Sequence, residues 1–122
     1  MTTIAFIDDE INILNAIKRL LRNTGWSVLT FTSSEMAIGE LGARDDINII
    51  VSDYHMIGMS GVELLNTFKK YTPNALRILL SGQADLQAVT LAINEAEIYR
   101  FITKPWIDEE FLITLTDRKS VV

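Results

Sequence analysis

The feature that most constrains the fold is a regular alternation of short apolar runs with segments of helical period. Five runs indicate strands, and in each following segment apolar residues recur every three or four positions. The predicted strands cover residues 3–8, 26–31, 47–52, 75–81 and 98–103. The predicted helices cover about 11–24, 33–42, 62–71, 85–96 and 108–119. Strict alternation implies an α/β fold with one doubly wound parallel sheet and helices on both faces.

Length and composition predict a single domain that spans residues 1–122. The formal net charge of −5 argues against direct nucleic-acid binding, because phosphate contacts need clustered Lys and Arg. The absence of cysteine excludes disulfides and thiolate metal sites. No apolar stretch approaches the ~18 residues of a membrane span, and no signal peptide is evident, so a cytoplasmic protein is expected.

Four of the predicted strands end on polar residues that can carry chemistry. The first run ends on Asp8 and Asp9, the third on Asp53, the fourth on Ser81 and the fifth on Lys104. Because the carboxyl ends of parallel strands meet at one edge of a sheet, these side chains are expected in one crevice. That crevice would hold three carboxylates, a hydroxyl and an ammonium.

Three carboxylates in one place repel each other and raise each other's pKa unless a cation lies among them. Carboxylate and carbonyl oxygens suit a hard cation, and Mg²⁺ is the usual one where phosphate is also bound. A carboxylate beside Mg²⁺ can attack phosphorus, and Lys104 could neutralise the charge of the transferred group. Ser81 could donate a hydrogen bond to a phosphoryl oxygen.

Four pieces of the chain, taken in order and spacing, resemble the response-regulator receiver domain of two-component signalling from end to end. The pieces are Phe6-Ile7-Asp8-Asp9-Glu10, Asp53-Tyr54-His55-Met56 followed by Gly61, Leu80-Ser81-Gly82, and Lys104-Pro105-Trp106. The resemblance implies the flavodoxin-like strand order 2-1-3-4-5, whose switch point lies between the first and third strands. Those two strands carry Asp8, Asp9 and Asp53.

The resemblance also implies a role for each site residue. Asp53 would be the phospho-acceptor, and Asp8, Asp9, Asp53 and the backbone carbonyl of His55 would bind Mg²⁺. Lys104 would contact the phosphoryl group, while Ser81 and Phe101 would form the switch. Only the carbonyl of His55 is expected to act, with its side chain facing solvent.

One residue departs from the family pattern, and a proline in the matching pieces suggests a local constraint. Ile57 stands where the family usually has proline, four residues after the acceptor. Pro105 directly after Lys104 suggests a cis peptide.

The stretches 80–85 and 98–106 are similar to receivers that precede HD-GYP-type phosphodiesterase domains, or to those of hydrogenase regulators. The sequence contains no effector in these 122 residues.

The predicted function is a phosphorylation switch that accepts its phosphoryl group from a sensor histidine kinase or phosphotransfer protein. The change would be relayed to the face of the fourth helix, fifth strand and fifth helix, for an effector or a homodimer partner. It would hydrolyse its own phosphate slowly without being a multiple-turnover enzyme. The alternatives are a docking module that takes no phosphate, an aspartyl-phosphate phosphatase and a flavodoxin-type cofactor binder. His55 in place of a second acid disfavours the phosphatase, and the acidic first loop disfavours the cofactor binder.

Overall fold

The computed structural model describes residues 2–82, 85, 90 and 96–116. Within these residues, five parallel strands form one sheet in the order β2-β1-β3-β4-β5, which confirms the predicted flavodoxin-like order. The strands are β1 (Thr3–Ile7), β2 (Ser27–Phe31), β3 (Ile49–Asp53), β4 (Leu76–Gly82) and β5 (Arg100–Lys104). The helices are α1 (Ile11–Leu21), α2 (Ser34–Leu41), α3 (Gly61–Tyr71) and α5 (Asp108–Thr116).

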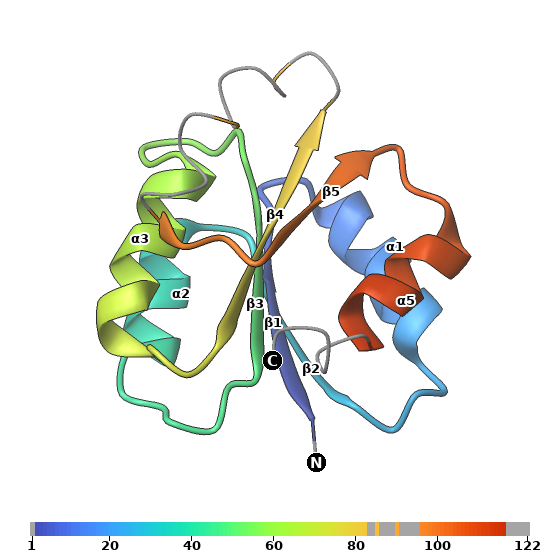
Figure 1. Cartoon of the computed structure of the whole chain (residues 1–122), viewed down its shortest axis with the longest axis horizontal. Helices are drawn as coiled ribbons and strands as arrows, with labels where there is room; N and C mark the ends of the chain where they lie inside the picture. Colours follow the sequence, from blue (N-terminus) through green and yellow to red (C-terminus); the bar gives the residue numbers. More distant parts are fainter. Residues whose placement is uncertain (1, 83–84, 86–89, 91–95, 117–122) are drawn as a thin grey trace.

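The sheet lies between two layers of helices, with α2 and α3 on one face and α1 and α5 on the other (Figure 1). Both faces of β1 are therefore covered, and all five of its residues are buried. Ile4 and Phe6 point into the cluster that includes α1 and α5, whereas Ala5 and Ile7 point into the cluster under α2 and α3. Alternate side chains point to opposite faces of the sheet. Because both faces are covered by helices, every position in the run is apolar.

Local hydrogen bonds set where the helices begin and end. The Ser33 side chain accepts from the backbone N–H of Met36 at 3.1 Å and thereby caps α2. The first helix ends at Leu21, three residues before the predicted end. The Thr24 hydroxyl donates to the Leu21 carbonyl at 2.7 Å, and Gly25 then takes φ +79°, a turn that closes the helix.

The carboxyl-terminal third differs from the prediction in its boundaries. β5 begins at Arg100, two residues later than predicted, because the chain turns first at Glu97, which has φ +50°. The predicted helix 85–96 falls largely outside the described residues, and so does the end of the predicted helix 108–119. Among the helices that the structure describes, none is long and apolar enough to cross a membrane.

Candidate functional site

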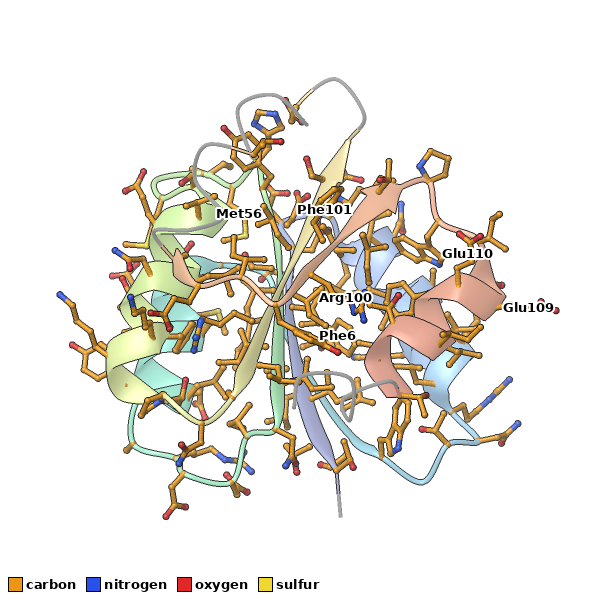
Figure 2. All side chains as sticks on the ribbon, in the orientation of Figure 1. Phe6, Met56, Arg100, Phe101, Glu109 and Glu110 are labelled. Atoms are coloured by element: carbon orange, nitrogen blue, oxygen red, sulfur yellow. The ribbon has the colours of Figure 1, made fainter. Side chains whose placement is uncertain are left out.

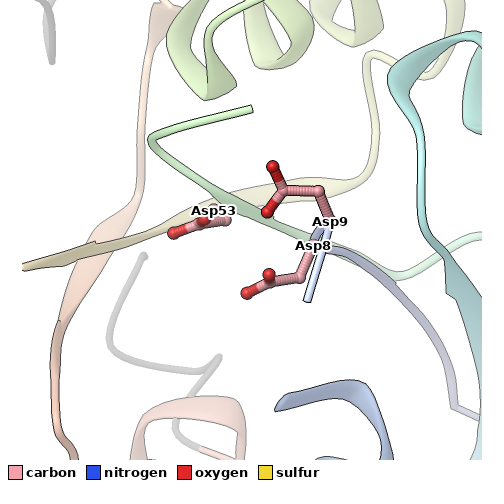
Figure 3. A group of neighbouring side chains, drawn as sticks. All are labelled: Asp8, Asp9 and Asp53. Carbon is pink, nitrogen blue, oxygen red and sulfur yellow. The ribbon is translucent and has the colours of Figure 1, made fainter. Parts of the chain in front are cut away.

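Three carboxylates meet at the carboxyl edge of the sheet, as the sequence predicts. Asp8 and Asp9 follow β1, and Asp53 is the last residue of β3, the neighbouring strand (Figure 3). One oxygen from each of the three lies within 4.8 Å of the others. Asp8 and Asp53 are 1% and 6% exposed, whereas Asp9 is exposed to solvent. The arrangement concentrates negative charge where little water is available to screen it.

Backbone hydrogen bonds hold the two buried carboxylates in place. The Asp8 N–H donates to the Phe31 carbonyl at 3.1 Å, and the Asp8 side chain accepts from the Glu10 N–H at 2.9 Å. After Asp53, the Tyr54 N–H donates to the Leu80 carbonyl at 2.8 Å. Each acid therefore sits at a point where its strand is still tied to a neighbouring strand.

The turn after Asp53 depends on a glycine. A Cβ added to Gly61 would overlap the Asp53 carbonyl oxygen, closer than any real contact allows. The Gly61 N–H also donates to the Tyr54 carbonyl at 2.9 Å. Sequence reasoning placed Gly61 in this turn without a role. The structure shows that a missing side chain lets the start of α3 lie against the Asp53 backbone.

Lys104 reaches the same site from the edge of the sheet. Its Nζ lies 2.8 Å from Asp53 Oδ1 and 3.0 Å from Asp8 Oδ2, and its side chain is 20% exposed. Burial alone would lower the pKa of Lys104. The hydrogen bonds with Asp53 and Asp8 outweigh burial, so the pKa of Lys104 lies above its ordinary value. The lysine therefore stays charged between the two acids.

The pKa of Asp53 is set by opposing effects of burial and neighbouring charges. Burial raises its pKa and the Lys104 hydrogen bond opposes the rise, but the charges of Asp8 and Asp9 add to it. The net pKa of Asp53 lies above the ordinary value for an aspartate. One ammonium thus leaves the three carboxylates short of positive charge, so a further cation would be stabilised here.

The two predicted switch residues lie on neighbouring strands. Ser81 is fully buried on β4, and its hydroxyl donates to the Gly82 carbonyl at 3.2 Å. Phe101 lies on β5 opposite Leu79, two residues before Ser81, and is 41% exposed (Figure 2). In this structure the hydroxyl is bonded to its own strand while the aromatic ring lies partly in solvent.

The loop after Asp53 carries His55 and Ile57. The His55 side chain is 73% exposed, which agrees with a solvent-facing histidine, and Ile57 is 88% exposed. However, His55 Nε2 lies 2.9 Å from Asp85 Oδ1. Sequence reasoning missed this contact, because nothing in the sequence shows that these two residues, 30 positions apart, meet. The predicted cis peptide between Lys104 and Pro105 is confirmed.

The donor set fits a hard divalent cation. Asp8, Asp9 and Asp53 offer carboxylate oxygens, which Mg²⁺ prefers over softer ligands. The exposed position of Asp9 keeps one side of the cluster open to solvent.

Comparison with known proteins decides the family. The family profile described as the response regulator receiver domain matches residues 4–116. The chain belongs to this family. Receiver domains of two-component response regulators are signalling switches and are generally not enzymes, so the family agrees with a switch in broad terms.

Several receivers in longer proteins are similar to this one. The hydrogenase transcriptional regulatory protein HoxA of Cupriavidus necator is 34% identical over 113 residues, which cover 93% of this chain and 23% of that protein. The solved receiver domain of an HD domain-containing protein from Pseudomonas fluorescens Pf-5 is 32% identical, with a TM-score of 0.89. It covers 98% of this chain and 94% of its own. A receiver domain from Clostridium thermocellum is also 32% identical, with a TM-score of 0.85 over 99% and 98% of the two chains.

This receiver spans about a quarter of the length of the first curated relatives that it matches. HoxA is a hydrogenase regulator, one of the two kinds that the sequence suggested, and the Pseudomonas protein is described only as HD domain-containing. What they regulate is a property of those proteins. The individual roles of the site residues stay predictions from the family resemblance.

Proposed function

We propose that this receiver is a phosphorylation switch in which Asp53 accepts a phosphoryl group from the phosphohistidine of a sensor histidine kinase or phosphotransfer protein. The observation that carries the proposal is the meeting of Asp53 with Asp8, Asp9 and Lys104 at one edge of the sheet. An Asp53 carboxylate oxygen attacks the phosphorus and forms a P–O bond. The P–N bond breaks, and its electron pair returns to the donor imidazole.

Lys104 supports this transfer through charge. Its ammonium already lies 2.8 Å from the acceptor oxygen, where a phosphoryl group on Asp53 would place new negative charge. The raised pKa of Lys104 keeps the amine protonated throughout the neutral range. Electrostatic stabilisation of the transferred group is the main contribution that a protein makes to phosphoryl transfer.

Asp8, Asp9 and Asp53 would hold Mg²⁺ together with the His55 carbonyl. When bound, the ion would supply positive charge that offsets the negative charge of the phosphoryl oxygens during transfer. The acid cluster supports this part of the proposal, because one ammonium does not balance three carboxylates.

The signal would then pass through Ser81 and Phe101 to the surface. In the proposed sequence, the Ser81 hydroxyl exchanges the Gly82 carbonyl for a phosphoryl oxygen, and Phe101 turns inward from its partly exposed position. Phosphate thereby favours one of two packings of the β5 face. An effector domain or protein, or a second copy of the chain, would bind that altered face.

The test is intact-mass spectrometry after incubation with acetyl phosphate and Mg²⁺. We expect the unaltered protein to gain the mass of one phosphoryl group and Asp53→Asn to gain none. Asp46→Asn is the matched control, because Asp46 is an exposed aspartate paired with Arg44 away from the cluster. It should label normally.

Each other outcome has a definite reading. Labelling retained in Asp53→Asn would show that the acceptor lies elsewhere. No labelling of the unaltered protein, by acetyl phosphate or by a histidine kinase, would favour a docking module that takes no phosphate.

A further inference from the structure

The contact between His55 and Asp85 ties the loop after Asp53 to a residue that follows β4. His55 lies two residues after Asp53, in the loop that leads from β3 to α3, and Asp85 lies four residues after Ser81. The imidazole Nε2 is 2.9 Å from Asp85 Oδ1. The loop that follows the acceptor is therefore tied to the segment that follows Ser81.

On the acceptor side, the contact adds to existing restraints on the backbone. The Tyr54 N–H and carbonyl are both held, by Leu80 and by Gly61. The rings of Tyr54 and His55 meet edge to face, with centroids 4.8 Å apart. The His55 side chain adds an anchor one residue further on. The His55 imidazole thus contacts the Tyr54 ring as well as the Asp85 carboxylate.

Asp85 is itself well placed to act as an anchor. Its side chain is 23% exposed, and its second oxygen lies 3.5 Å from the position that a Cβ on Gly82 would occupy. The carboxylate therefore packs beside the end of β4. A neutral imidazole with its proton on Nε2 can donate to this carboxylate, so the contact requires no charge on His55.

We propose that Asp85 is a positioning residue for the metal site, which acts by holding the His55 main chain so that its carbonyl faces the three carboxylates. This inference rests on the proposed function, in which that carbonyl is a metal ligand. Partners that orient metal ligands without touching the metal commonly change metal affinity when they are removed.

The test is a double-mutant cycle on Mg²⁺ affinity, measured by isothermal titration calorimetry at one neutral pH. Because the His55 side chain is 73% exposed, we expect His55→Ala and Asp85→Ala each to weaken Mg²⁺ binding only about threefold. Asp85→Ala should cost clearly less Mg²⁺ affinity in the His55→Ala background than in the unaltered protein. His55→Gln keeps an N–H donor and should recover most of the affinity.

The cycle separates positioning from charge. Asp85→Ala also removes a negative charge near a cation, and that effect would be the same whether or not His55 is present. An equal loss from Asp85→Ala in both backgrounds would overturn the proposal, as would unchanged affinity in both single variants. Asp46→Ala measures the effect of removing an exposed carboxylate outside the site, and it should leave the affinity unchanged.

Asp53→Asn distinguishes this failure from failure of the proposed function. Mg²⁺ binding that depends on Asp53 but not on the His55–Asp85 pair would refute only the positioning role. Mg²⁺ binding that does not depend on Asp53 would refute the metal site itself.

Discussion

The two strands that bring Asp53 and Lys104 to the site are packed very differently. β3 lies inside the sheet between β1 and β4, and all five of its residues are buried. β5 lies at the edge, where Arg100 and Phe101 are exposed and Ile102 is buried. Asp53, the predicted reacting group, thus lies on a fully buried central strand. Lys104 and Phe101 lie on an edge strand, whose side chains can repack at a smaller cost in free energy.

The largest expected effect tests this difference directly through stability. Ile50→Ala on β3 removes fully buried atoms and should lower the free energy of unfolding by about 3 kcal/mol. Phe101→Ala removes a larger side chain, but one that is 41% exposed, and should cost only about 1 kcal/mol. Urea unfolding followed by circular dichroism measures both values. Equal losses would show that β5 is as firmly packed as β3.

The next largest effect on stability is expected at the turn between β3 and α3. Gly61→Ala would force a methyl group against the Asp53 carbonyl, so we expect a loss of about 2 kcal/mol together with weaker Mg²⁺ binding. Gly39→Ala is the matched control, since a Cβ at this exposed position in α2 meets nothing within 4 Å. It should raise stability by about 0.5–1 kcal/mol. A Gly61→Ala variant as stable as the unaltered protein would mean that the turn can move away from Asp53.

The smallest effect tests whether the buried acid strains the fold. Burial raises the pKa of Asp53, so the folded state holds that proton more firmly than the unfolded state does. The ionised acid therefore lowers stability at neutral pH. This penalty shrinks as pH falls through the folded-state pKa of Asp53 and is gone below the unfolded pKa. Without Mg²⁺, Asp53→Asn should be more stable by an amount on the order of 1 kcal/mol at pH 7. Thermal unfolding at pH 7 and pH 3 measures it, and a less stable variant at pH 7 would contradict the expected sign.

Sequence reasoning could predict the architecture because the signal is local and repeated. Apolar runs such as Ile49–Val51 are apolar at every position only because both faces of their strand are covered. The same logic predicted that Asp8, Asp53 and Lys104 would meet, since each lies at or beside the carboxyl end of a parallel strand. Topology alone converts those distant positions into one site.

Contacts between loops and turns were beyond that logic. Nothing in the pattern indicated that His55 would find Asp85. Arg77 was one basic residue among several scattered along the sequence, yet it is buried and its Nε donates to the Ala96 carbonyl at 2.9 Å. The Arg77 guanidinium Nη2 also lies 3.7 Å from Glu97 Oε2, and Glu97 forms the turn that precedes β5. Such contacts depend on how loops pass one another in space, which residue periodicity does not encode.

The ion pair between Asp8 and Lys104 joins residues 96 positions apart, and this separation has a consequence for the order of events during synthesis. A nascent chain that has emerged only as far as β4 already contains all three acids but not the lysine that balances two of them. The complete set of charged groups comes together only after the edge strand docks. A chain would therefore be able to receive a signal only after all five strands have joined the sheet.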